Sequence, residues 1–174
     1  MASSNAYDCI LARDWAGLVA AVEEDPTTAQ YKTVYGTIPL HVASGNLQAP
    51  VYALRALLTA WPLGAMTKND FGSLPLHWAA IAHNIPAADI LLSAFPRALV
   101  EKDDLGQKPK DIARLYGSHE LEAVLVEAER VMTVRRGWAI LRSLVWTLML
   151  HSRAVVRANH PDVLFAQGYF NQLD

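Results

Sequence analysis

The sequence predicts an all-α protein built from repeated helix pairs, and three landmarks that recur in phase predict it. A six-residue string begins at Ile38, Leu74 and Lys108, so its copies start 36 and 34 residues apart. A proline precedes a glycine by ten residues in each repeat, and a lysine stands four residues before that glycine. These residues are Pro26, Pro62, Pro96, Gly36, Gly72, Gly106, Lys32, Lys68 and Lys102. Because self-similarity at a fixed period is typical of repeat architectures, we expect a solenoid of about four helix-turn-helix repeats.

Each predicted repeat consists of a turn, a short helix, a second turn and a longer helix. The glycine permits the tight turn, and the proline of the string suits the first turn of the short helix, where its missing N–H needs no partner. We expect Pro50 and Pro86 to open two longer helices. Trp61 and Phe95 should close them, because a residue that precedes proline disfavours helix. Such a pair cannot bury its apolar face alone, so neighbouring repeats must stack.

These strings resemble the ankyrin-repeat family, whose repeat of about 33 residues has the hallmark Thr-Pro-Leu-His-x-Ala. Residues 39–43 and 75–79 are close matches, and residues 109–113 are a weaker one. The resemblance covers residues 5–126, in repeats of about 5–36, 37–72, 73–106 and 107–126, and the first is degenerate. It implies that His41 and His77 tie helix starts to neighbouring turns. Ile38, Leu74 and Lys108 replace the family's threonine, a lost cap that costs ~1 kcal/mol per helix.

The C-terminal third differs in charge from the rest. Residues 1–129 carry nine Lys or Arg and fifteen Asp or Glu, whereas residues 130–160 carry six Arg and no acid. Apolar residues recur at helical spacing from Val131 to Val156, which predicts a basic amphipathic helix within 127–160, before a tail at 161–174. Its charge-free stretch, 143–150, is too short to span a membrane. The helix could cover the last repeat, lie on an anionic membrane surface, or bind a partner or a second copy.

If this helix covers the last repeat, its apolar stripe should pack there. The arginines along one border of the stripe, Arg135, Arg142 and Arg153, should be solvated or paired with acids of residues 1–129. The stripe residues are Trp138, Leu141, Val145 and Leu148, and the candidate acids are Glu122, Glu127 and Glu129.

No motif predicts catalysis, a metal site or a cofactor, so we expect none of them. His119 and Glu120 begin like a zincin motif, but position 123 is alanine, so the second histidine is missing. Cys9 lies in an apolar context and should be inert. This single cysteine and the lack of a secretory signal predict a cytoplasmic or otherwise intracellular location. The net charge of −2 argues against nucleic acid as a partner.

The ankyrin resemblance also implies that a partner protein binds at the turn tips and at the exposed side of each short helix. The tip positions carried over are Tyr35, Thr37, Asp70, Phe71, Ser73, Asp104, Leu105 and Gln107. Tyr35, Phe71 and Leu105 stand in register, as an apolar ladder that could anchor a partner. Alternatively, each tip packs on the next as framework. Trp78 is expected mainly in the core.

The sequence thus predicts a non-catalytic scaffold or adaptor for protein–protein interaction. The alternative is a peripheral membrane adaptor docked by the basic helix 131–157.

Overall fold

A computed structural model describes residues 6–134, and every regular element in that range is helical. The prediction of an all-α fold is therefore confirmed for this range. The chain divides into two compact units, residues 1–131 and 132–174, and the repeats described below belong to the first. From residue 135 onward, the predicted basic helix, its apolar stripe and the tail lie outside the described residues.

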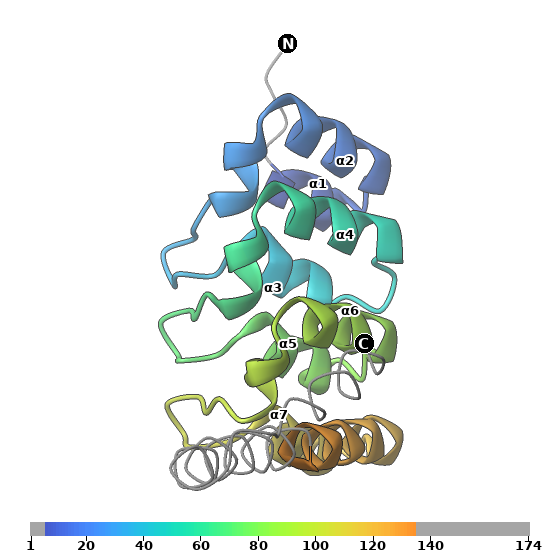
Figure 1. Cartoon of the computed structure of the whole chain (residues 1–174). Helices are drawn as coiled ribbons and strands as arrows, with labels where there is room; N and C mark the ends of the chain where they lie inside the picture. The colour runs from blue at the N-terminus through green and yellow to red at the C-terminus, as the bar shows by residue number, and fades with distance from the viewer. Residues whose placement is uncertain (1–5, 135–174) are drawn as a thin grey trace, which may run out of the picture. The chain divides into compact units, whose positions relative to one another are not determined.

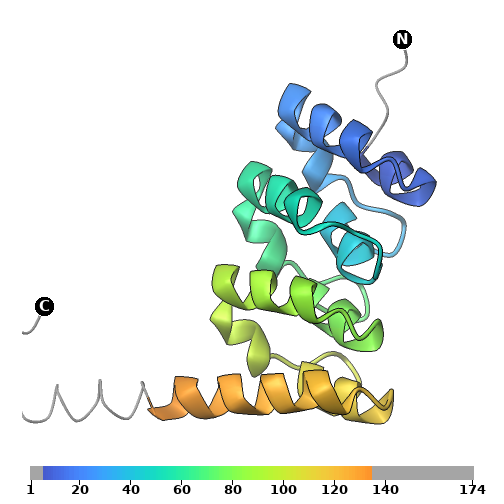
Figure 2. The same cartoon turned by 90° about the vertical axis from the view of Figure 1, so that its right-hand side faces the viewer.

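Within residues 6–131 the chain forms helix pairs that stack on one another, as Figures 1 and 2 show. In chain order they are α1 (Ala6–Ala12) with α2 (Trp15–Glu24), α3 (Pro39–Ser44) with α4 (Val51–Ala60), α5 (Pro75–Ile81) with α6 (Ile85–Ala94), and α7 (Pro109–Leu115) with a helix that begins at residue 119. The first helices α1, α3, α5 and α7 pack in one layer, and the second helices α2, α4 and α6 pack in another. We call the pairs repeats one to four.

The first helices of repeats two to four begin at proline, as predicted. None of them has a side-chain cap at the preceding residue. Instead, the side chain of the third helical residue accepts a hydrogen bond from the backbone N–H of the residue before the helix. The bonds run from Ile38 to His41 Nδ1 (3.3 Å), from Leu74 to His77 Nδ1 (3.0 Å) and from Lys108 to Asp111 Oδ2 (3.1 Å). This bond is the half of a capping box in which the third helical residue bonds back to the residue before the helix. It satisfies the backbone N–H of that preceding residue, whereas a threonine there would have accepted from the N–H of the third helical residue.

The second helices α4 and α6 end at the residues that the sequence predicts, but each starts one residue away from its predicted start. Trp61 and Phe95 directly follow α4 and α6 as predicted, and each precedes a short 3₁₀ helix that the sequence did not predict. These 3₁₀ helices are η2 (Pro62–Met66) and η3 (Pro96–Leu99), and η1 (Pro26–Gln30) follows α2 in the same way. Pro50 caps α4 instead of opening it. Pro86 is the second residue of α6, because Asn84 caps that helix by accepting from Ala87 N at 3.1 Å.

The last helix of the stack starts at residue 119 and continues without a break to residue 134, where the described range ends. It therefore passes through position 126, the predicted end of the repeats.

Small residues at one recurring position let the first helices pack closely. Ala43, Ala79 and Ala113 hold the same place in α3, α5 and α7, and all three are fully buried. Leu40 and Leu76 fill the space beside them. Each buried leucine contributes about 1.5–3 kcal/mol of transfer free energy, so this layer is a principal source of stability. It also fixes both ends of the first helices, where the surface features described next are found.

Candidate interaction surfaces

Three turn tips lie at the N-terminal ends of α3, α5 and α7, and they share one hairpin structure. In each tip, the first residue donates its backbone N–H to the carbonyl of the fifth, at 3.0 Å: Thr33 to Thr37, Asn69 to Ser73 and Asp103 to Gln107. The glycine in fourth place has φ of 66° to 77°, a conformation that favours glycine. The loops project on the same side of the stack, at the left of Figure 1. Tip residues that are equivalent in the sequence repeats therefore lie in line along one side of the stack.

Adjacent tips are joined through their backbones. Asp70 donates its N–H to the carbonyl of Tyr35, and Asp104 donates to that of Phe71, both at 3.1 Å. The glycine of one tip allows the next tip to come this close. A Cβ on Gly36 would lie 3.2 Å from the backbone nitrogen of Asp70, and closer still to its carboxylate. The tips thus form a continuous and rigid edge.

Apolar side chains are exposed along this edge. Tyr35 is 60% exposed, Phe71 56% and Leu105 82%. The rings of Tyr35 and Phe71 lie with centroids 6.0 Å apart and planes tilted by 30°. We call these three residues the tip edge. Val34, the tip position before Tyr35, is 87% exposed.

The other predicted tip residues fall into two groups. Asp70 and Asp104 are exposed next to the tip edge. Thr37 is only 5% exposed, and Ser73 and Gln107 are half-buried, because the last residue of each tip turns inward to enter the helix. The structure therefore brings five of the eight residues to the surface and uses Thr37, Ser73 and Gln107 as framework.

His41 and His77 are fully buried beneath the tips. His41 Nε2 lies 2.9 Å from the carbonyl oxygen of Ser73 in the next tip, so its Nε2–H donates while Nδ1 accepts from Ile38. Burial lowers the pKa of His41 to about 4, although the Ser73 carbonyl acts in the opposite direction. Burial also lowers the pKa of His77, opposed by Asp103 and by the carbonyls of Gln107 and Glu101. Both imidazoles are therefore neutral at neutral pH. Only His41 makes the expected link to the next tip, because the buried His77 Nε2 has no hydrogen-bond partner among the described residues, and His77 Nδ1 accepts from Leu74 of its own repeat.

The structure offers no metal site among residues 6–134, because no three His, Cys, Asp or Glu side chains are grouped there. Cys9 is a buried free thiol. Its burial raises its pKa, with Asp14 and Asp8 adding to the effect, which leaves the thiol a poor nucleophile.

A hollow of about 690 Å³ at the opposite ends of the first helices was missed by sequence reasoning. Trp78 lies in its wall, half-buried, with its ring edge-on to His41 at 5.9 Å. The prediction that Trp78 belongs mainly to the core is thus only partly right. The signal was the tryptophan itself, since Val42 and Ile112 hold the same place in the neighbouring repeats.

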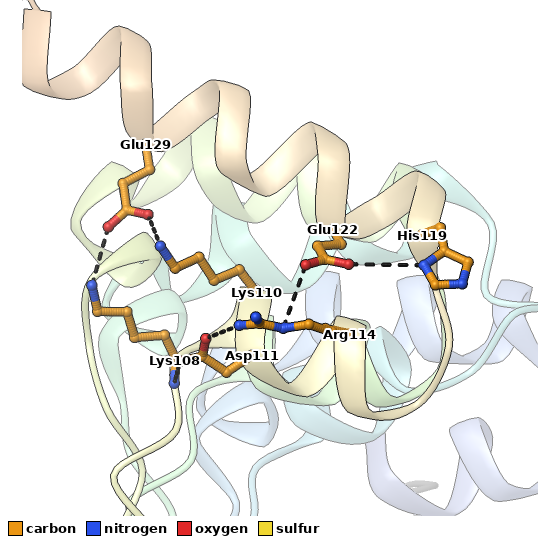
Figure 3. Close-up of polar contacts among 7 residues, drawn as sticks. All are labelled: Lys108, Lys110, Asp111, Arg114, His119, Glu122 and Glu129. Carbon is orange, nitrogen blue, oxygen red and sulfur yellow. Dashed lines mark hydrogen bonds and ion pairs between the residues drawn. The ribbon is translucent and has the colours of Figure 1, made fainter.

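Ion pairs connect the helix that begins at residue 119 to α7 and to Lys108 just before it (Figure 3), while Leu121 and Leu125 of this helix are fully buried. Glu129 lies between Lys108 and Lys110, and these two lysines hold its pKa below the usual range. Arg114 contacts both Asp111 and Glu122. Lys110 replaces a leucine of the other repeats, so the last repeat exchanges an apolar contact for a charged one.

The three acids that were expected to pair with Arg135, Arg142 or Arg153 form ion pairs with other residues in the described part of the chain. Glu129 pairs with the two lysines, Glu122 with Arg114, and Glu127 with Arg130 at 2.7 Å.

Comparison with described protein families finds none that matches the chain, and comparison with curated proteins finds no relative. Within residues 6–134, no helix combines the length and the hydropathy that crossing a bilayer requires.

Proposed function

We propose that the chain is an ankyrin-type array that acts as a non-catalytic scaffold, binding another protein through its tip edge and the adjoining side of its first helices. The observation that carries this proposal is the exposure of Tyr35, Phe71 and Leu105 in register along one rigid edge. Exposed apolar groups in contiguous arrangement are typical of interaction sites.

Two observations support an ankyrin-type array. The first helices α3, α5 and α7 recur with the sequence offsets of 36 and 34 residues. A histidine in the third position of a first helix links that helix to the next tip, as the family resemblance implies for His41.

The chemistry of the edge favours a protein as the occupant. Backbone bonds between tips fix their spacing before binding, so little conformational entropy is lost when a partner docks. Apolar side chains can fill pockets of the partner, while Asp70 and Asp104 beside them suit Lys or Arg at the rim.

A purely structural role for the tips explains less. The ring contact of Tyr35 with Phe71 does stabilise neighbouring tips. Leu105, however, is 82% exposed. A Cβ on Gly106, which follows it, would have no atom within 4 Å, so no neighbouring tip of the described chain packs there. Exposure of this kind contributes little to folding.

We further propose an intracellular setting, since the one cysteine, Cys9, is a free thiol. The proposal is tested by capture from the native cell with the intact chain, in parallel with a variant carrying Tyr35→Ser, Phe71→Ser and Leu105→Ser. A specific partner should be recovered by the wild type and lost by the folded variant. Equal recovery by both would show that the tips are not the binding edge.

A further inference from the structure

We propose that the hollow around Trp78 is a second binding site, which takes a segment of a partner protein that carries a large apolar side chain next to an aspartate or glutamate. The site lies apart from the tip edge, because the tips precede the first helices and the hollow lies where these helices end. Val42 and Trp78 of its lining belong to first helices, so the inference extends the proposed function along these helices, but it does not require the tip edge to bind a partner.

A break in the repeat pattern builds this hollow. Repeat two is two residues longer than repeat three, and the loop between its helices, residues 45–50, is longer than the loop at 82–84 in repeat three. Leu47 in this longer loop is 67% exposed. The loop is held in place by the buried Asn84. Its Nδ2 donates to the carbonyls of Ser44 at 3.1 Å and Asn46 at 3.0 Å. The extended loop is therefore an ordered wall of the hollow.

Gly45, at the end of α3, brings Trp78 to the surface of the hollow. A Cβ at this position would lie 3.1 Å from Cε3 of Trp78, closer than ordinary contact allows. Trp78 therefore contacts the end of α3, and together with Leu11 of α1 and Leu47 of the loop it gives the hollow an apolar floor that spans three repeats. Aromatic floors of this kind supply large contact area at low entropy cost.

Two residues in the wall adopt an unfavourable backbone conformation. Arg13 and His83 follow α1 and α5, and each has φ of 57°, whereas Gly117 holds the same place in repeat four. This conformation ends the helix at all three positions, because the residue and the one after it donate their N–H groups back to carbonyls of the helix: Arg13 to Ile10, His83 to Ala80 and Gly117 to Arg114. Both side chains line the hollow.

Charge identifies the occupant. Arg13 is the one residue of the lining with a permanent charge, and no aspartate or glutamate lines the hollow within the described chain. A guanidinium beside an apolar floor binds a carboxylate best, through two parallel N–H···O bonds that strengthen when water is excluded. An apolar side chain on Trp78 would exclude that water. The hollow is open and extends over three repeats, which suits a chain segment more than an enclosed small molecule.

The test is a library of peptides with a fixed central leucine or phenylalanine and randomised flanks, screened against the full chain. The selected peptides should be enriched in Asp and Glu close to the fixed residue. The best of them should lose at least tenfold in affinity on Arg13→Gly, which keeps the backbone conformation that Gly117 already shows, and on Leu47→Ser at an exposed position. Arg97→Gln removes the same charge at an exposed site outside the hollow and should leave the affinity unchanged.

Two results would overturn the inference. One is a set of peptides without acidic enrichment, or with equal affinity for wild type and Arg13→Gly. The other is binding of laurate, which combines a carboxylate with an apolar chain, by a protein that selects no peptide. Leu105→Ser separates the two proposals, because it alters the tip edge and should leave peptide affinity at the hollow unchanged.

Discussion

The Nε2 atom of His41 lies 2.9 Å from the carbonyl oxygen of Ser73, 32 residues further along the chain, and it joins the first helix of repeat two to the tip of repeat three. The bond requires a neutral imidazole in the tautomer that carries its proton on Nε2, because Nδ1 accepts from Ile38. The same ring therefore caps its own helix and sets the spacing of the next repeat.

Acid should weaken this link. The pKa of His41 is lowered to about 4 from 6.5, chiefly by burial, so the unfolded chain binds more protons between these two values. The contribution of this histidine to the free energy of unfolding is complete above pH 6.5. It should fall by about 1.4 kcal/mol per pH unit for this histidine, and by about 3 kcal/mol in all near pH 4. His77 acts in the same direction.

Urea unfolding at pH 6.5 and pH 5 measures this effect, above the range in which the carboxylates of ordinary pKa titrate. His41→Gln should reduce the pH dependence, while His83→Gln, at an exposed position, should retain it. Equal stability of the wild type at the two pH values would contradict the burial of neutral imidazoles.

Contacts between tips can be separated from backbone strain by comparing two glycines. Gly72 and Gly106 both have positive φ, of 68° and 77°, so alanine should cost about 1–2 kcal/mol at either. Gly72 also faces Asp104 of the next tip, whereas no atom lies within 4 Å of a Cβ on Gly106. Gly72→Ala should therefore destabilise by about 1–3 kcal/mol more than Gly106→Ala, as overpacking does. Equal losses in chemical unfolding would mean that the tips do not depend on this close approach.

Relief of strain should separate stability from binding at the hollow. Arg13→Gly should raise the free energy of unfolding by up to about 1 kcal/mol, because φ of 57° is unstrained for glycine. Arg55→Gly, at an exposed position inside α4, should lower it by about 1 kcal/mol and serves as the control. A loss of stability in Arg13→Gly comparable to that of Arg55→Gly would show that the arginine is needed for folding.

Much of the fold could be predicted because proline and glycine mark its boundaries locally. The prolines that open α3, α5 and α7 and the residues that close α4 and α6 follow from backbone restriction alone. Pro50 was misplaced by one residue because proline suits both a cap and a first helical turn. Asp111 stands where the other two strings have a histidine, and its carboxylate accepts the same bond from the backbone of Lys108.

The candidate sites were harder to predict, since they depend on distances between repeats. The repeat spacing predicts that Tyr35, Phe71 and Leu105 lie in line. It does not predict that the chain turns inward at Thr37 and buries that residue. The hollow at Trp78 needs the ends of three helices and an extended loop to meet, and no single segment contains that information.

The central claim is that the tip edge binds a protein, and affinity for the captured partner tests it most directly. Tyr35→Ser, Phe71→Ser and Leu105→Ser should each weaken binding at least tenfold, while the melting temperature stays close to that of the wild type, because all three side chains are more than half exposed. Tyr52→Ser, Leu63→Ser and Val126→Ser remove similarly exposed apolar groups away from the tips and should leave affinity unchanged. Unchanged affinity in the folded tip variants, or equal losses in both sets, would contradict the account.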